Sequence, residues 1–399
     1  MADSDPATIL QQALYQLETG NPEKAAETAG LALRSNPENA EALFLIGRCR
    51  ALLNQNTEAI NALEQASERL PDRLELFNLL GHLLYHERHH EKAITAFRRC
   101  VELDPDHVEA HRQLANLCLS NDQPEAIRLF ERAHQLAPNH ADLLFDYAWG
   151  TMYTVGDTDR GGDLFCKWLQ LDHGTADRGS IAVQALNYPS NQNPTELAQA
   201  HFQWAEKHMN HFGRDFDFGD HDFSDNRRIR LGMLSGDFCR HPVGRFAMLL
   251  CHHLDLQRFE LFIYSNNHET DELKPSFEEH AVWCDVTRLT DDEAAIKIRE
   301  DRVEILLDLS GHTKGNRLGI VARKPAPIQA ALFAYPNTTG LGAVDYRVTD
   351  PHSDPAGATE SLWQEKLEYM PHTPWLYLPP LGFKSETAPP PSTTGKPFT

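Results

Sequence analysis

The sequence has no run of about 18 apolar residues, and its first ten residues, MADSDPATIL, contain neither a basic segment nor an apolar core. We therefore expect neither a membrane-spanning helix nor a secretory signal. Cationic residues are also few: 37 Lys and Arg stand against 58 Asp and Glu, which gives a net charge of −21. Such a chain repels phosphate backbones and anionic lipid, so nucleic acid and membranes are not expected partners.

Paired cysteines are missing as well. The seven cysteines show no CxxC spacing, and such an odd, scattered set is typical of reduced thiols in a cytoplasmic protein. Histidine is abundant, at 21 residues, and His82, His86 and His90 share one helical stripe. No cysteine or carboxylate stands at ligand spacing to them, so we expect no metal site and interpret these histidines as the flanks of a turn.

What the sequence does contain is an internal repeat. Four prolines recur at spacings of 34, 34 and 33 residues: Pro37, Pro71, Pro105 and Pro138. Small residues return upstream of each one: Ala25 and Ala32, Ala59 and Ala66, Ala93 and Cys100, Ala126 and Ala133. Small residues let two antiparallel helices approach closely, and the proline ends the second helix. The pattern resembles the tetratricopeptide repeat, with four good copies and a degraded fifth from Ala141.

Stacked repeats of this kind form an α-solenoid with a concave groove, which we assign to residues 1–175. The groove either holds an extended protein or peptide segment or belongs to a scaffold only, and we favour the first interpretation. Across residues 159–180 we expect a closing helix and a loop. Residues 176–226 then hold a connecting helix, capped by Asn193 and Pro194, and an acidic linker.

From residue 227 to residue 380, apolar runs alternate with segments of helical period. The expected strands lie within residues 229–238, 259–267, 304–313 and 328–340. This alternation predicts a parallel sheet covered by helices on both faces, in a Rossmann-like, doubly wound domain.

Ligands of such sheets meet the loops at the carboxyl ends of the strands. That rule selects three loops, SGDFCRHPVGR, SGHTKGNR and YPNTTG, which carry His241, His312 and Thr339 respectively. The imidazole of His241 either serves a reaction or merely caps the helix that begins near Pro242. For His312, a structural role in shaping its loop is the favoured interpretation.

These loops, together with LNYPSNQNPTELAQAHFQWAEKH and DYRVTDPHSDPAGATE, resemble the catalytic region of the protein O-linked N-acetylglucosamine transferase family, including its bacterial and SPINDLY-like members. The resemblance spans Leu186 to Pro380. It implies a two-lobed glycosyltransferase of the GT-B type, inverting and independent of metal or other cofactors. The family default is transfer of N-acetylglucosamine from its UDP ester to Ser or Thr of a protein held by the repeats.

The resemblance also assigns residues. His241 falls on the position proposed as catalytic base, and an imidazole that titrates near neutral pH suits the removal of a hydroxyl proton. His312 and Thr339 line the site. Asn337 and Ala334 stand where the family motif usually has glycine.

The sequence contains only one such lobe. Residues 381–399 form a proline-rich tail, which is typical of a linker and ends where the first strand of the second lobe should start. No donor-binding residue is therefore expected within the chain, and we expect the 399 residues alone to be inactive as a transferase. The alternative is a non-catalytic adaptor that binds proteins through its repeats. The sequence leaves the donor sugar, the acceptor proteins and a homodimer open.

Overall fold

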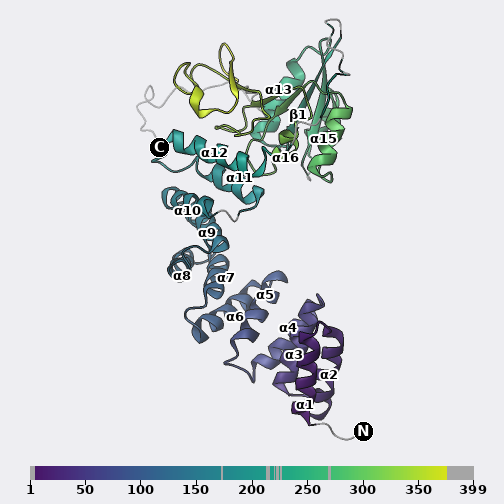
Figure 1. The fold of residues 1–399 in the computed structure, drawn as a ribbon, viewed down its shortest axis with the longest axis vertical. Helices are drawn as coiled ribbons and strands as arrows, with labels where there is room; N and C mark the ends of the chain where they lie inside the picture. Colours follow the sequence, from purple (N-terminus) through teal and green to yellow (C-terminus); the bar gives the residue numbers. More distant parts are fainter. Residues whose placement is uncertain are drawn as a thin grey trace, which may run out of the picture. The chain divides into compact units, whose positions relative to one another are not determined.

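The computed structural model describes residues 5–171, 174–212, 216–219, 221, 224, 227–267 and 271–374. The chain divides into two compact units (Figure 1): unit 1 is Met1–Gly174 with Tyr188–Asn191, and unit 2 is Thr175–Asn187 with Gln192–Thr399. We describe each unit by itself. The predicted proline-rich tail and most of the predicted linker before residue 227 lie outside the described residues.

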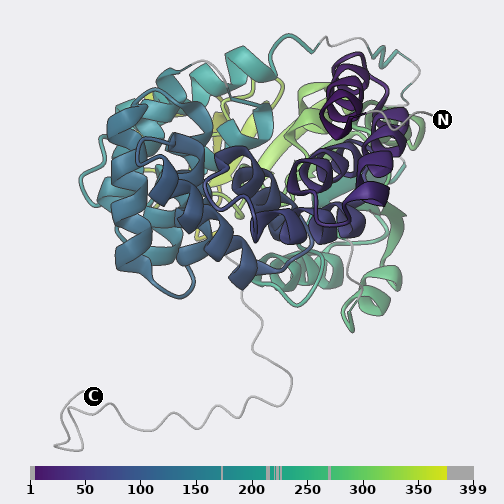
Figure 2. The same ribbon diagram turned by 90° about the horizontal axis from the view of Figure 1, so that it is seen from below.

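Unit 1 consists of helices that pack in successive pairs (Figure 2). They are α1 (Pro6–Glu18), α2 (Pro22–Ser35), α3 (Ala40–Leu52), α4 (Asn56–Ser67), α5 (Leu74–His86), α6 (His90–Leu103), α7 (Val108–Cys118), α8 (Gln123–Leu136), α9 (Ala141–Trp149), the π-helix η1 (Gly150–Val155) and α10 (Thr158–Gln170). The four periodic prolines follow the ends of α2, α4, α6 and α8. The predicted α-solenoid is thereby confirmed.

Small residues allow the two helices of a pair to touch. A Cβ atom on Gly47 would lie 2.6 Å from Leu63 Cγ, and one on Gly81 would lie 2.8 Å from Phe97 Cε1. In these two pairs, therefore, the first helix offers a glycine against which the second helix packs a large apolar side chain. The repeated alanines are buried for the same reason.

The expected single stripe of histidines is wrong, because His82 and His86 lie in α5 whereas His90 begins α6. The turn between the two helices is as interpreted, and His82 takes part in their packing. The His82 ring meets the ring of Phe97 edge to face, with centroids 5.2 Å apart, and burial lowers the pKa of His82. In the described ranges, no three His, Cys, Asp or Glu side chains are grouped so as to hold a metal ion. None of the described helices is long and apolar enough to cross a bilayer.

Unit 2 begins with two helices, α11 (Ala176–Ala185) and α12 (Pro194–His208). The prediction of a loop at the end of residues 159–180 is wrong, because α11 starts there. Thr175 caps α11 by accepting a hydrogen bond from Arg178 N at 3.4 Å. A Cβ on Gly179 would lie 2.6 Å from Trp204 Cδ1, so α11 packs against α12 at a glycine. For this reason the sequence of α11 lacks the apolar periodicity that predicts a helix.

The rest of unit 2 is an α/β domain. Its strands are β1 (Ile229–Ser235), β2 (Phe259–Ser265), β3 (Ala281–Asp285), β4 (Ile305–Asp308), β5 (Ile328–Leu332), β6 (Tyr346–Thr349) and β7 (Lys366–Tyr369). Its helices are α13 (Pro242–His253), α14 (Lys274–Glu278), α15 (Asp291–Glu300), α16 (Leu318–Ala322) and the 3-10 turn η2 (Glu360–Leu362). The described strands pair in the order β3-β2-β1-β4-β5-β6-β7, and every pair is parallel.

The predicted Rossmann-like sheet is thus confirmed, with three strands, β3, β6 and β7, added to those expected. One face packs on α13 through a cluster that includes Met233, Ile263 and Ala247. Tyr264 points the other way, and its hydroxyl donates to Asp301 Oδ2 at 2.8 Å, just beyond α15. Both faces are therefore covered, which explains the continuous apolar runs in β1 and β2.

Candidate active site

The three loops selected from the sequence follow β1, β4 and β5, which are neighbours in the sheet. The strand order reverses at β1, which has β2 on one side and β4 on the other. A crevice at such a switch point is the usual ligand site of a parallel sheet. Here Ser235 Oγ and Ser310 Oγ are 3.1 Å apart, and Asn266 Nδ2 donates to Gly315 O at 3.0 Å. The carboxyl ends of β1 and β2 therefore meet the loop after β4 at this point.

His241 lies at the start of α13, and its imidazole is accessible to solvent. It is the N-cap of α13, and its Nδ1 accepts a hydrogen bond from Val243 N at 3.3 Å. Its side chain is nevertheless 46% exposed. The Asp237 carboxylate lies 3.7 Å from the same Nδ1 atom. Sequence reasoning missed Asp237, although it stands only four residues before His241 in the same loop.

Gly244 determines how close this loop lies to α13. A Cβ atom there would stand 2.2 Å from Cys239 O and 2.8 Å from Asp237 O. Real Cβ atoms do not approach backbone oxygens this closely, so a side chain would push the loop away. The glycine of the HPVG sequence therefore helps to hold His241 at the carboxyl edge of β1.

His312 lies inside the unit rather than at its surface. Its Nδ1 is 2.9 Å from Ser180 Oγ, and its Nε2 is 3.0 Å from Thr339 O. The ring also meets the Trp204 ring edge to face, with centroids 4.5 Å apart. Burial lowers the pKa of His312 well below its ordinary value. With both nitrogens occupied and the ring neutral, His312 is built to hold α11 and the loop after β5 in place.

Thr339 is also buried, and its hydroxyl is engaged. Its Oγ1 donates to Glu365 Oε1, and its backbone N–H donates to the same oxygen at 2.8 Å. Thr338 Oγ1 donates to the second Glu365 oxygen at 2.6 Å. One carboxylate therefore organises the YPNTTG loop. Sequence reasoning missed Glu365, which lies 26 residues further along the chain.

A second buried histidine extends this network into α12. His201 Nε2 is 2.7 Å from Tyr335 Oη, which also accepts from Asn187 Nδ2 at 3.0 Å. Burial lowers the pKa of His201 to about 4, so its ring is neutral at pH 7. The rings of His201 and His312 meet edge to face with centroids 5.0 Å apart. The helices before the sheet are thereby joined to two of the candidate loops.

Asp308, the last residue of β4, is hydrogen-bonded to the backbone of the SGHTKGNR loop. Its Oδ2 accepts from Gly311 N at 2.8 Å, while its buried Oδ1 has no hydrogen-bond partner among the described residues. Burial raises the pKa of this carboxyl from its ordinary value to about 6. The carboxyl group therefore supports the loop through one oxygen while the other oxygen is unsatisfied, and burying its ionised form costs free energy.

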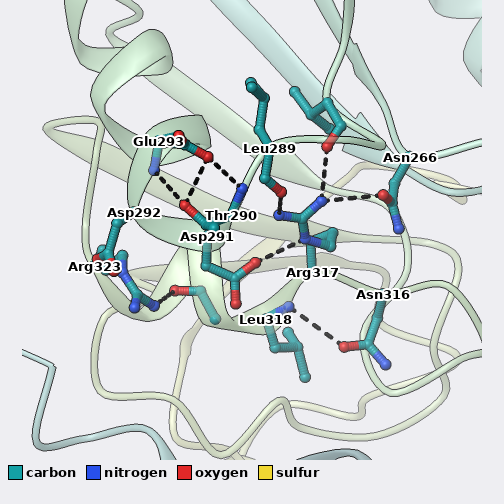
Figure 3. A network of polar contacts seen from close by, with 12 residues as sticks. Asn266, Leu289, Thr290, Asp291, Asp292, Glu293, Asn316, Arg317, Leu318 and Arg323 are labelled. Atoms are coloured by element: carbon teal, nitrogen blue, oxygen red, sulfur yellow. Dashed lines mark hydrogen bonds and ion pairs between the residues drawn. The ribbon is translucent and has the colours of Figure 1, made fainter.

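Arg317 ties the other end of this loop to the β2 and β3 side of the sheet (Figure 3). Its Nε donates to Asp291 Oδ1 at 2.7 Å, and its Nη1 donates to Asn266 Oδ1 at 3.1 Å. The guanidinium also donates to two carbonyl oxygens, Val286 O at 2.9 Å and Leu289 O at 2.8 Å. Each of its nitrogens is used within the protein, so this arginine has a structural role.

The structure thus separates the predicted site residues. His312 and Thr339 touch each other within a buried network, whereas His241 is half-exposed. Among the described residues, no hydrogen bond joins His241 to either of them. Of the three, only His241 presents a titratable group to solvent at the sheet edge.

Comparison with known proteins decides the family. The model of glycosyl transferase family 41 matches residues 183–377, and tetratricopeptide repeat models match residues 10–73 and 74–107. The chain contains a glycosyl transferase family 41 domain. The matched family-41 region contains α12, the whole sheet and all three loops, so the geometry above is that of a family-41 lobe.

Several proteins named as peptide N-acetylglucosaminyltransferases are similar to this chain. A SPINDLY protein of Oryza sativa is 32% identical over 218 residues, which are 53% of this chain and 23% of that protein. A UDP-N-acetylglucosamine–peptide N-acetylglucosaminyltransferase of Caenorhabditis elegans is 36% identical over 150 residues, 37% of this chain and 13% of that protein. The chain thus spans less than a quarter of the length of these relatives.

A solved structure extends the similarity to the repeats. An O-GlcNAc transferase variant of Thermobaculum terrenum superposes with a TM-score of 0.55 at 29% sequence identity, covering 74% of this chain and 57% of that one. The combination of repeats with a family-41 lobe is therefore shared with a transferase of known structure.

Proposed function

We propose that this chain supplies the acceptor-binding repeats and the first catalytic lobe of a GT-B protein O-N-acetylglucosamine transferase. The observation that supports this most is the half-exposed imidazole of His241 at the switch point of a family-41 lobe. The relatives of this chain are named as transferases from UDP-N-acetylglucosamine to peptides, which suggests the same donor and acceptor here.

In the proposed reaction, His241 removes the proton from a Ser or Thr hydroxyl as the oxygen attacks the anomeric carbon. A hydroxyl is a poor nucleophile at neutral pH, and a neutral imidazole is a suitable base. The new C–O bond forms on the face opposite to the leaving UDP, so the configuration inverts. We further propose that no metal ion takes part, and that cationic side chains and helix N-termini facing the diphosphate assist its departure.

The donor site belongs, in this proposal, to a second lobe. The described residues contain one parallel sheet, whereas a GT-B enzyme closes two lobes around its donor. We accordingly propose that residues 1–399 alone transfer no sugar. The cytoplasm is the proposed location, since the seven cysteines show no pairing pattern.

The repeats offer a surface for the acceptor. In unit 1, α1, α3 and α5 line a cavity of about 630 Å³. Its wall includes Leu10, Leu14 and Phe44, and the guanidinium of Arg73 lies 5.4 Å from the centre of the Phe44 ring. An apolar groove with charged groups at its edge suits an extended peptide segment.

Label transfer tests the proposal. Two proteins would be compared: residues 1–399, and a chimera that joins residues 1–377 to the second lobe of the Thermobaculum terrenum enzyme. Each would be incubated with labelled UDP-N-acetylglucosamine and an acceptor protein. We expect incorporation by the chimera only, and a loss of at least about 100-fold on His241→Ala. His253→Ala, an exposed histidine at the other end of α13, should leave incorporation unchanged.

A folded chimera that binds UDP but transfers nothing would contradict the proposal. It would favour the second candidate, a non-catalytic adaptor, for which the groove of unit 1 is the supporting observation. Equal activity of His241→Ala and the parent chimera would remove His241 from the mechanism while leaving the transferase assignment in place.

A further inference from the structure

One ring nitrogen of His241 faces two groups with opposite requirements. The Val243 backbone N–H, 3.3 Å from Nδ1, needs a lone pair there. The Asp237 carboxylate, 3.7 Å from the same Nδ1, needs a proton there. A neutral imidazole carries one proton, on either Nδ1 or Nε2, so it can satisfy only one of these groups at a time.

The two arrangements differ in what the opposite nitrogen can do. When Nδ1 accepts from Val243, the proton is on Nε2, and Nε2 has no lone pair to offer. When Nδ1 carries the proton and donates it to Asp237, the lone pair of Nε2 is free to take a proton from a hydroxyl. The capped form therefore cannot act as a base through Nε2, and the form paired with Asp237 can.

We propose that Asp237 is a positioning residue that holds His241 in the tautomer whose Nε2 accepts the acceptor's proton. This inference rests on the proposed function of His241. During the step, the O–H bond of the acceptor breaks and its proton moves to Nε2, while the oxygen bonds to the anomeric carbon and UDP leaves with the electron pair. The resulting imidazolium donates from Nδ1 to the Asp237 carboxylate, which compensates its charge.

The surroundings of Asp237 suit this role. Its side chain is 21% exposed, so the pair is shielded from solvent on one side. Burial raises the pKa of the Asp237 carboxyl, and the charge of a protonated His241 acts in the opposite direction, so it favours the carboxylate form of Asp237. The other nearby carboxylates are engaged elsewhere: Asp271 accepts from Arg240 N, and Glu272 lies 3.7 Å from Arg240 Nε.

The backbone fixes the carboxylate at this place. Asp237 N donates to Ser235 Oγ at 3.0 Å, which anchors it at the end of β1. Cys239 N donates to Asp237 O at 2.8 Å, and the absence of a Cβ on Gly244 lets that carbonyl lie against α13.

The test is the tautomer itself, read from the ¹⁵N shifts of the His241 ring in residues 1–399. The ¹⁵N signals of the ring would be followed with rising pH until they change no further, so that the neutral ring is observed, and they would be assigned by their loss in His241→Ala. We expect Asp237→Asn to shift the ratio of tautomers at least about tenfold toward Nε2–H, because an amide NH₂ donates to Nδ1 where the carboxylate accepted. Asp237→Ala should shift it in the same direction.

Asp271→Asn is the matched control, because Asp271 supports the same loop without touching the imidazole. A shift in the Asp237 variants but not in Asp271→Asn supports the inference. An unchanged ratio in the Asp237 variants, or an equal shift in Asp271→Asn, overturns it. The readout needs no donor lobe, so a failure of sugar transfer would count against the proposed function and not against the Asp237–His241 pairing.

Discussion

Replacing Arg317 by lysine should loosen the β2, β3 and α15 side of unit 2. The guanidinium makes four hydrogen bonds there, to Asp291, Asn266, Val286 O and Leu289 O. Its side chain is only 14% exposed, so water can replace few of these contacts. An ammonium group can retain the pairing with one carboxylate but cannot reach the two carbonyls and the amide at once.

The expected cost follows from the bonds lost. Two to three hydrogen bonds from a charged donor disappear, and each contributes about 1.5 kcal/mol at the low end of the usual range. Allowing for partial compensation by the lysine, the free energy of local opening should fall by about 3 kcal/mol. At about 1.4 kcal/mol for each factor of ten, this is roughly a 100-fold rise in the opening equilibrium.

Hydrogen exchange read by mass spectrometry measures this opening segment by segment. Amides of β3 and of the first turn of α15 should exchange roughly 100-fold faster in Arg317→Lys, while peptides of unit 1 serve as an internal reference. Arg288→Lys, an exposed arginine in the same turn, is the matched control and should change little. Protection that stays within about threefold of the parent protein would refute the structural role assigned to Arg317.

Three further predictions concern unfolding free energies. Gly244→Ala should lower the unfolding free energy of unit 2 by at least about 2 kcal/mol, because the new Cβ meets two backbone oxygens. Gly30→Ala, whose Cβ would have no atom within 4 Å, should instead stabilise α2 by about 0.5–1 kcal/mol, and urea denaturation distinguishes the two signs. Burial raises the Asp308 pKa to about 6, so the stability that its protonated form provides is lost as the pH rises through that value. The unfolding free energy of Asp308→Asn, relative to that of the parent protein, should therefore rise by about 3 kcal/mol between pH 4 and pH 8, and a pH-independent difference would contradict this. His312→Ala should lower the unfolding free energy of unit 2 by about 3 kcal/mol because it removes two buried hydrogen bonds, whereas His241→Ala, at an exposed N-cap, should lower it by about 1 kcal/mol. Equal losses in thermal unfolding would contradict the division between buried and exposed histidines.

The repeats could be predicted from sequence because their signals are local. Each proline acts on the helix just before it, and each small residue marks a contact within one helix pair. The four apolar strands were found for a similar reason, since a strand buried on both faces is apolar along its whole length. Edge strand β3 was missed because Val282 is 48% exposed and its run is only partly buried.

Helix α11 shows where local reasoning fails. Its packing depends on Gly179 against Trp204 and on Ser180 against His312, and neither glycine nor serine indicates a helix. Only tertiary contact makes these residues suitable there. The position of His241 needed no such information, because a strand followed by a loop and a proline-started helix predicts it directly. The partners of Thr339 were not predictable, since Glu365 belongs to a later segment.

The glycines of the α3–α4 and α5–α6 pairs have a consequence for how this chain can change. Gly47 and Gly81 are 34 residues apart, and so are Leu63 and Phe97, the side chains that they receive. These two copies therefore close their helix pairs through the same contact, which lies within each copy. Duplication or deletion of one such 34-residue unit would leave that contact intact in the remaining copy, so the number of copies can vary in evolution while the family-41 lobe stays the same.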